Sequence, residues 1–464
     1  MRSRNTRRGM AFAAALVSAG LVLAGCGGDD SDGDTEASGT SPGDGKAGCE
    51  QLTQFGDLTG KKVGIYTSIV APEDKPYIDS FQLFEDCTGA EVVYEGSKEF
   101  ETQLPVRVET GNPPDIAFIP QPGLLQSLVR DYPDAVKEAP EQVSDNVDEF
   151  YGPDWKAYGT VDDVFYAPPL TANVKSFVWY SPKVFKENGW EIPTTWDEML
   201  ELSDTIAATG MKPWCAGIGS GEATGWPATD WVEDVLLRTA GGDVYDQWVA
   251  HEISFNDPAV VEALDTVGGI LKNNDYTNGG FGDSKSIAST EFTDGGLPIV
   301  ANPPECAMHR QASFYAANWP EGTDVSEEGD AFAFYLPAID PEQGSPVLGG
   351  GEFVTAFSDS IQTQALMTYI SGGEWVNEKG KATTRGGFVS ANKNLDIANV
   401  ASPIDKLSVE ILQQEGAVFR FDGSDLMPGP VGAGSFWKEM TAWIGEDQST
   451  EKTLDNIEKS WPAS

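Results

Sequence analysis

Three short apolar segments constrain the fold of this chain more than any other feature of its sequence. They span residues 62–66, 91–94 and 115–119, and aromatic residues at helical spacing over 77–84 separate the first two. The apolar residues of the segment 104–108 do not clearly follow either the helical or the strand repeat, but the position of the segment between two strands favours a helix. Strand–helix–strand–helix–strand is the opening of a doubly wound α/β domain, in which ligands bind beyond the carboxyl ends of the strands.

Two of the predicted strand ends are followed by polar, turn-forming residues. Residues 96–100 follow the second strand and contain Glu99, and residues 120–123 follow the third strand and contain Gln121. A carboxylate accepts hydrogen bonds from a polar ligand, and an amide both donates and accepts them. We therefore expect Glu99 and Gln121 to be ligand-binding residues.

The amino terminus predicts export and lipidation. Four arginines among the first eight residues precede an apolar run at 10–23, which is too short for an ordinary transmembrane helix. The run leads into Leu-Ala-Gly before Cys26, a sequence that resembles the lipobox of bacterial lipoproteins. We expect residues 1–25 to be the signal peptide. Cys26 would then carry the lipid that holds the protein at the outer, extracellular face of the cytoplasmic membrane, and residues 26–48 would form a disordered acidic tether.

The charge balance excludes some classes of partner. The chain has 464 residues and a formal net charge of −43, with 73 acidic against 30 basic residues. Such a surface repels nucleic acids and anionic ligands, whereas a cationic ligand remains compatible with it. The chain has only two histidines, which argues against a transition-metal site and a histidine-based catalytic triad. We therefore expect no metal, no cofactor and no nucleic-acid partner.

The cysteines other than Cys26 are even in number, as expected for disulfides in an exported protein. Cys49, Cys87, Cys215 and Cys306 allow three pairings. We favour Cys49–Cys87 and Cys215–Cys306, because each pair then lies within one half of the molecule.

The segment 225–234 has the composition of a sugar-binding loop, because it places two indoles and three carboxylates close together. Asp230 and Glu233 have the spacing of a capping box, which predicts that a helix begins near Asp230. Trp226 would then lie in the loop before the helix, and Trp231 in its first turn. Indoles stack on the C–H faces of sugar rings, and carboxylates accept hydrogen bonds from hydroxyls. The alternative is that Asp230 only caps the helix and that Trp231 only packs into the core.

Residues 49–464 are too many for one small core and predict two domains. Extended segments at 165–172, 332–337 and 385–390 are the expected crossings between them. Residues 421–434, which are rich in glycine, proline and acids, predict a surface loop near the cleft or the hinge.

An ordered set of motifs extends along the chain, at residues 111–118, 175–180, 193–198, 214–218, 225–234, 308–314 and 349–353. Together they resemble the extracytoplasmic solute-binding lipoproteins of carbohydrate ABC importers, a maltose-binding-protein-like family. Single motifs are weak, but the ordered set covers nearly all of residues 50–464. The Gly-Trp-Pro-Ala-Thr-Asp-Trp run with the paired cysteines is most similar to the alpha-glucoside-binding subgroup.

The resemblance implies an α/β fold of two lobes, each a doubly wound sheet with flanking helices, joined by three hinge crossings. It divides the chain into first-lobe segments 50–170 and 336–388 and second-lobe segments 171–335 and 389–464. It further implies a monomeric protein that is not an enzyme. Such a protein captures a sugar, here an alpha-glucoside or another oligosaccharide, between its closing lobes and delivers it to the transmembrane permease subunits of an ABC importer.

The resemblance and the residue chemistry together assign roles in the site. Three indoles are expected to stack on the sugar: Trp179, Trp226 and Trp231. Three carboxylates are expected to accept hydrogen bonds from its hydroxyls, and three other side chains to donate: Glu99, Asp230 and Glu352, and Gln121, Lys175 and Arg310. Gly350 and Gly351 would let backbone amides approach the ligand, and Arg385 completes the expected set. Lys175 could instead be a charge at a sheet edge, Arg310 an ion-pair partner, and Glu352 a residue that caps a turn.

Two other functions are compatible with parts of the sequence. The acidic balance would suit an importer receptor for a polyamine or a peptide. Tryptophans and carboxylates would also suit a secreted glycosidase, although the order of lobe and crossing segments and the lipid tether argue against it. Residues 49–464 contain no Gly-x-Ser-x-Gly nucleophile elbow, so we expect no catalytic residues.

Overall fold

The structure is a computed structural model that describes residues 40–412 and 418–462. The expected signal peptide and Cys26 lie outside these residues, as does the first part of the expected tether. Residues 40–48, which we had assigned to that tether, form turns held to the end of helix α2 (Gln82–Thr88). Ser41 Oγ and the Gly43 amide both donate to the Cys87 carbonyl, at 2.6 and 2.8 Å. Composition gave no sign of this order, because it comes from hydrogen bonds to a helix end rather than from apolar burial.

The first lobe is built on a four-stranded sheet in the order β12-β3-β1-β2. β1 (Lys62–Thr67) lies parallel to β2 (Glu91–Gly96) and to β3 (Ile116–Ile119), and β12 (Phe353–Ala356) runs antiparallel to β3. The three strands expected at the start of the chain are therefore confirmed. Their parallel pairing places their carboxyl ends at one edge of the sheet.

Both faces of this sheet are covered by helices, as a doubly wound domain requires. Ile116 and Phe118 of β3 pack into one apolar core, and the alternating Ala117 and Ile119 pack into another. The helices of the first core are α1 (Lys75–Ser80), α2, α11 (Ile361–Ser371) and α12 (Gly373–Ala382). Those of the second are α3 (Phe100–Glu109) and α4 (Pro122–Asp131). The lobe is completed by η1 (Glu50–Phe55), α5 (Glu141–Phe150), α6 (Pro153–Tyr158) and the hairpin β4 (Thr160–Val161) and β5 (Val164–Phe165).

The second lobe has a mixed sheet in the order β10-β7-β9-β8. β7 (Phe177–Tyr180) is antiparallel to both β10 (Phe332–Tyr335) and β9 (Cys306–Arg310), and β8 (Lys212–Trp214) is parallel to β9. This differs from the doubly wound sheet that we expected. The reason is that β7 carries the chain in from the first lobe and β10 carries it back, so the two strands lie side by side in opposite directions.

Helices flank this second sheet and share one large apolar core with it. Two of these helices begin at side-chain caps, one at the Thr195–Glu198 capping box and the other at Asp257 before Pro258. The helices are α7 (Pro182–Asn188), α8 (Trp196–Ala208), α9 (Trp226–Val249), α10 (Pro258–Leu271), α13 (Pro403–Leu412), α15 (Trp437–Gly445) and α16 (Thr450–Glu458). Among residues 40–412 and 418–462, no helix combines the length and apolarity that a bilayer span requires.

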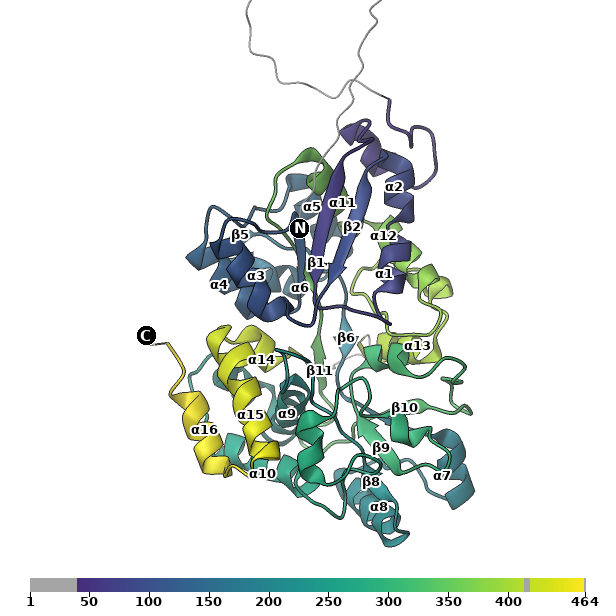
Figure 1. The fold of residues 1–464 in the computed structure, drawn as a ribbon, viewed down its shortest axis with the longest axis vertical. Helices are drawn as coiled ribbons and strands as arrows, with labels where there is room; N and C mark the ends of the chain where they lie inside the picture. The colour runs from purple at the N-terminus through teal and green to yellow at the C-terminus, as the bar shows by residue number, and fades with distance from the viewer. Residues whose placement is uncertain (1–39, 413–417, 463–464) are drawn as a thin grey trace, which may run out of the picture. The chain divides into compact units, whose positions relative to one another are not determined.

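A small third sheet lies between the two lobes (Figure 1). It consists of β6 (Asn173–Val174), β11 (Val347–Gly350) and β13 (Phe419–Phe421), in the order β13-β11-β6. The segment after α12 joins it through a bridge between Ala172 and Val389. The chain thus passes between the lobes at three neighbouring places, next to this sheet.

The two disulfides are those that we favoured. Cys49 is bonded to Cys87, which ties η1 to α2 in the first lobe. Cys215 is bonded to Cys306, which ties the end of β8 to the start of β9 in the second lobe.

Candidate functional site

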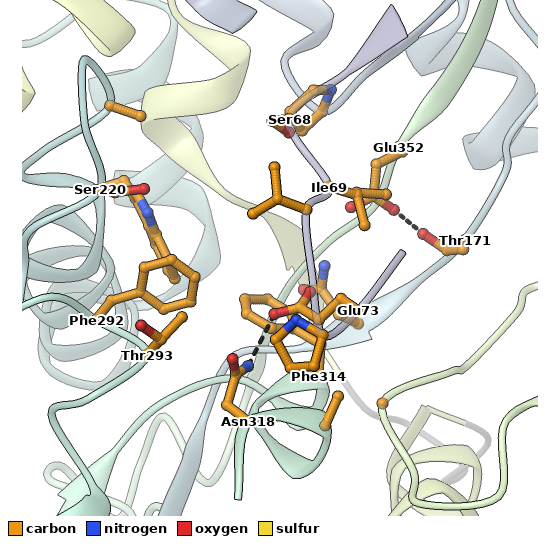
Figure 2. Close-up of a pocket in the computed structure, with 18 of the residues that line it drawn as sticks. Ser68, Ile69, Glu73, Thr171, Ser220, Phe292, Thr293, Phe314, Asn318 and Glu352 are labelled. Carbon is orange, nitrogen blue, oxygen red and sulfur yellow. Dashed lines mark hydrogen bonds between the residues drawn. The ribbon is translucent and has the colours of Figure 1, made fainter. Parts of the chain in front are cut away.

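A cavity of about 390 Å³ lies between the lobes and is lined by residues of both. Its first-lobe wall contains the loop after β1 (residues 68–73), Lys98 and Glu101 after β2, and Gln121 after β3. The expected position of a ligand beyond the carboxyl ends of the strands therefore coincides with a real cavity. Figure 2 shows Ile69, Thr171 and Glu352 on one side of it and Ser220, Phe292 and Thr293 on the other.

The second-lobe wall of the cavity is aromatic. The ring centroid of Trp226 lies 5.1 Å from that of Phe292 and 6.0 Å from that of Phe314. Trp226 is only partly buried, and all three rings line the cavity. The ring planes of Phe292 and Phe314 are inclined to that of Trp226 by 65° and 50°, so the three rings form an angled apolar surface against which the flat face of a ligand ring can pack.

The first-lobe wall carries carboxylates. Thr171 donates a hydrogen bond to Glu352, and Asn318 Nδ2 donates one to Glu73 Oε1 at 2.8 Å, as Figure 2 shows. Within the described residues, Glu73, Glu101 and Glu352 form no ion pair, and all three line the cavity. Burial raises the pKa of Glu73 to about 7, and the neighbouring Glu352 adds to the rise although the bond from Asn318 opposes it. Burial likewise raises the pKa of Glu101 and of Glu352 to about 7.

One lysine of the first lobe also reaches the cavity. Lys379 of α12 is buried, donates to Thr383 Oγ1 at 3.0 Å and lies over the ring of Tyr77, 4.0 Å from its centroid. Burial lowers the pKa of Lys379 to about 7, although Asp405 and Glu352 oppose the shift. The Nζ of Lys379 at this position can donate hydrogen bonds to a ligand.

Lys175 lines the cavity, but its charge is already balanced from behind. Its Nζ lies 3.1 Å from Asp230 Oδ1 and 3.8 Å from Asp425 Oδ2, and it also pairs with Asp422. Burial alone would lower the pKa of Lys175, but the three carboxylates raise it well above its ordinary value. Lys175 is therefore the cavity-facing end of a buried ion cluster.

The remaining members of this buried ion cluster join α9 to β9. Arg310 lies 3.3 Å from Asp230 and 2.8 Å from Asp234, and Arg238 also pairs with Asp234. Arg310 is almost fully buried and does not line the cavity. The expected role of Arg310 as a donor to the ligand is thus replaced by the ion-pair alternative.

The start of α9 differs from the expectation. The helix begins at Trp226 rather than near Asp230, because Gly225 adopts φ 117° and Pro227 lies in the first turn. Asp230 consequently lies one turn inside the helix, where it is buried and holds Lys175 and Arg310 instead of capping the helix or facing the cavity. Glu233 is also buried and accepts from the amides of Gly423 and Ser424, at 3.1 and 3.0 Å.

Two of the three expected stacking indoles pack into the core. Trp231 is 3 % exposed and packs edge-on against Trp214, with centroids 5.4 Å apart. Trp179 is fully buried, and its Nε1 donates to the Gln311 carbonyl at 3.1 Å. Trp231 follows Trp226 by five residues, so the two side chains point in different directions from the helix. That of Trp226 faces the cavity, and that of Trp231 faces the core of the lobe.

Three other expected residues lie outside the cavity lining. Glu99 is exposed at the start of α3, and its neighbours Lys98 and Glu101 line the cavity instead. Arg385 donates to the carbonyls of Trp319 and Pro320. Gly350 lies behind the cavity, where an added Cβ would meet Lys175 at 3.2 Å. The expected residues that do line the cavity are Gln121, Lys175, Trp226, Gly351 and Glu352.

The sequence interpretation missed several cavity residues. Glu73 belongs to the loop after β1, the one strand end of the three to which we had assigned no chemistry. Asp425, which lines the cavity, and Asp422, which pairs with Lys175, belong to the segment 421–434, which we expected to be a surface loop. This segment instead forms α14 (Gly423–Leu426) and η6 (Pro430–Phe436), and both aspartates are buried.

Three carboxylates near the cavity lie close enough together to hold a metal ion. Asp230, Glu233 and Asp422 place one oxygen each within 4.8 Å of one another. Lys175 and the amides of α14 already provide positive partners to these oxygens. The described residues therefore balance this group without an ion.

Comparison with known proteins identifies the family. A profile of bacterial extracellular solute-binding proteins matches residues 67–295. The osmoprotective compounds-binding protein GgtB of Synechocystis sp. is 40% identical over 417 residues, which cover 89% of this chain and 96% of the relative. The chain belongs to the bacterial extracellular solute-binding proteins. This result confirms the family that the ordered motifs indicated.

This solute-binding protein is also similar to a second sequence relative and to a solved structure. The alpha-glucosides-binding periplasmic protein AglE of Rhizobium meliloti is 36% identical over 428 residues, 89% of this chain and 90% of the relative. The solved structure of the bacterial solute receptor AcbH, described as having a preference for β-D-galactopyranose, superposes with a TM-score of 0.71 at 20% identity, over 86% of this chain and 97% of that one. The latter likeness confirms the two-lobe fold. The sequence relatives are binding proteins and not enzymes, as expected for this chain.

Proposed function

We propose that this solute-binding protein captures a small sugar, with an alpha-glucoside as the first candidate, and delivers it to the permease of an ABC importer. The observation that carries the proposal is the contrast between the two walls of the cavity. Trp226, Phe292 and Phe314 form an apolar wall on one lobe, and Glu73 and Glu352 lie on the wall across from it. A pyranose has the matching surfaces, since its ring face presents C–H groups and its edge presents hydroxyls.

The lobes divide the work of binding between them. The ring would stack on Trp226 of the second lobe while its hydroxyls donate to carboxylates of the first lobe. A ligand that touches both walls favours the closed arrangement over an open one, because only the closed arrangement offers both sets of contacts. The closed form would then dock on the transmembrane subunits of the importer. Lipidation of Cys26 would keep the monomer near that permease, at the outer face of the membrane.

The relatives support the ligand class. GgtB is named for osmoprotective compounds and AglE for alpha-glucosides, and both align with nearly the whole of this chain. An alpha-glucoside bears many hydroxyl groups. That chemistry suits the cavity carboxylates Glu73, Glu101 and Glu352, which accept hydrogen bonds from hydroxyls.

A polyamine is the second candidate, and one observation favours it. Within the described residues, the cavity carboxylates Glu73, Glu101 and Glu352 lack ion-pair partners, and Lys175 is neutralised by the cluster behind it. An ammonium group could occupy that position. The aromatic wall and the sequence relatives nevertheless favour the sugar.

A thermal-shift screen tests the two candidates. The chain from residue 27 onward, without lipid, is heated with alpha-linked and beta-linked mono- and disaccharides and with putrescine and spermidine. A ligand that binds only the folded state raises the melting temperature by mass action. We expect a shift with at least one saccharide and no hydrolysis product after incubation. A shift with the polyamines alone would contradict the sugar assignment, and product formation would contradict the receptor function.

A further inference from the structure

We propose that the cavity accepts a sugar of one or two rings and excludes longer chains, because two bridges between the lobes block the crevice at its rims. This inference rests on the proposed function and adds a limit on ligand length. It is carried by contacts that connect one lobe to the other across the cavity.

The first bridge is an ion pair between the lobes. Lys98, which follows β2 in the first lobe, places its Nζ 2.6 Å from Glu291 Oε2 in the second lobe. Lys98 also lines the cavity, and Glu291 directly precedes the lining residue Phe292. The side chains of Lys98 and Glu291 are 42% and 41% exposed, so the pair has the cavity on one side and solvent on the other. A sugar chain that left the cavity here would have to displace it.

Backbone contact reinforces this bridge. A Cβ added to Gly221 would lie 2.9 Å from the Lys98 carbonyl oxygen, which is closer than real side chains approach. Gly221 precedes α9 in the second lobe, so the two lobes touch here through main-chain atoms. Rotating a side chain cannot open such a contact. Only a rotation of one whole lobe against the other could make room for a sugar ring.

The second bridge is a hydrogen bond elsewhere along the crevice. Asn318 ends η4 (Ser313–Asn318) in the second lobe and donates to Glu73 in the first lobe at 2.8 Å, as Figure 2 shows. Both residues line the cavity, and the neighbouring Ala71 and Pro72 are exposed. The bridge therefore lies where the cavity wall meets the surface.

The third chain crossing closes the region beside the second bridge. A Cβ at Gly387 would lie 3.0 Å from the Phe314 carbonyl oxygen, so the crossing segment packs directly against η4. Gly387 and Phe314 both line the cavity. A ligand therefore finds main chain on this side as well as the side-chain bridge.

The size of the enclosed space agrees with the limit. The cavity volume of about 390 Å³ is near the lower end of the ~300–1,000 Å³ that small-molecule sites occupy. A short saccharide fills such a space and still touches the aromatic wall and the carboxylates together. A longer chain must extend through the crevice and hold the lobes apart, so it loses contact with one wall.

Titration calorimetry on the chain from residue 27 onward tests the inference with alpha-linked glucose oligomers of one to five rings. We expect the tightest binding at one or two rings and binding weaker by about 10-fold or more from four rings onward. Equal or tighter binding of the longer oligomers would overturn the length limit while leaving the sugar-receptor function intact. Binding of spermidine with no response to any oligomer would instead count against the proposed function itself.

Variants of the bridges connect the limit to its cause. Glu291→Gln removes the ion pair at nearly constant volume, and Asn318→Ala removes the second bridge. Each variant is expected to reduce the affinity ratio between the two-ring and four-ring oligomers by about 3-fold or more. Glu262→Gln, an exposed glutamate on α10, is the matched control and should leave the ratio at the wild-type value. A wild-type ratio in both bridge variants and in their double variant would show that the bridges do not set the limit.

Discussion

Two groups of carboxylates lie within and behind the same cavity, and they differ in their partners. The buried ion cluster has a cation beside each of its carboxylates; its members are Asp230, Asp234, Asp422, Asp425, Lys175, Arg238 and Arg310. The cavity carboxylates have hydrogen bonds but no ion pair within the described residues; they are Glu73, Glu101 and Glu352. The first group is satisfied by the protein, and the second is left for a ligand to satisfy. The role of an acidic residue in this protein is therefore set by its partners and not by its residue type.

The largest expected effect comes from breaking the buried ion cluster. Arg310→Ala leaves Asp230 and Asp234 buried with one cation fewer, so we expect it to lower the free energy of unfolding by ~3–5 kcal/mol. Lys183→Ala removes an exposed ion pair with Asp330 and is the matched control, with an expected loss much smaller than that of Arg310→Ala. Urea unfolding measures both. Equal losses in the two variants would mean that the buried cluster is no more structural than a surface pair.

The next largest effects are expected from the two indoles of α9. One substitution should change the free energy of unfolding, and the other should change the affinity for sugar. Trp231→Ala removes a buried ring and should lower the free energy of unfolding by ~3–5 kcal/mol. Trp226→Ala should leave stability nearly unchanged and weaken binding of the sugar by ~2 kcal/mol, or about 30-fold, because Trp226 forms the cavity wall. Chemical unfolding and calorimetry measure the two quantities separately. A loss of affinity from Trp231→Ala alone, in a protein of wild-type stability, would reverse the assignment of the two rings.

The apolar pattern was sufficient for the three strands that open the first lobe. The apolar run at 115–119 indicated a strand buried on both faces, and β3 is such a strand because its pairing is parallel and helices cover both sides. The mixed sheet of the second lobe was not predictable in the same way. Its strand directions depend on how the chain enters and leaves the lobe, which no local pattern encodes.

The candidate site was predicted only where local sequence controls the geometry. Gln121 follows a strand end, and Trp226 follows a glycine with positive φ, so short-range rules place both at the cavity. Asp230 and Arg310 have the chemistry of ligand-binding residues, but a distant aspartate or lysine neutralises each of them. The segment 421–434 supplies Asp422 to that network, 247 residues after its partner Lys175. Contacts between residues so far apart in sequence could not be read from composition.

The cavity carboxylates should reveal themselves through pH. Glu352 has a pKa of about 7 in the folded protein against about 4.5 in the unfolded chain, so the folded state retains its proton over that interval. The contribution of Glu352 to the free energy of unfolding therefore falls as pH rises from about 4.5 to about 7. Glu352→Gln cannot ionise, and we expect it to stabilise the ligand-free protein by ~1–2 kcal/mol at pH 8 and by little at pH 4. Thermal unfolding across this range measures the difference.

The buried ion cluster gives the opposite result under the same conditions. Asp234→Asn removes a charge that Arg310 and Arg238 already balance, so the variant should be less stable than the wild type at pH 8. Stabilisation by both substitutions, or by neither, would remove the distinction between the two groups of carboxylates. Stabilisation by Glu352→Gln together with weaker sugar binding would show that the unpaired acid costs stability in order to bind the ligand.

The smallest expected effect compares two glutamates that are two residues apart. Glu101 lines the cavity and accepts from Gln121 Nε2 at 3.4 Å, whereas Glu99 is exposed at the start of α3. Glu101→Gln should weaken sugar binding by ~1 kcal/mol, or about 5-fold, because it replaces a charged acceptor with a neutral one. Glu99→Gln should change affinity by less than about 2-fold, since screened surface charges contribute little. Calorimetry at two ionic strengths distinguishes the two glutamates. The loss of affinity in Glu101→Gln should persist at high salt. A larger, salt-sensitive loss in Glu99→Gln would instead show that Glu99, as the sequence predicted, binds the ligand.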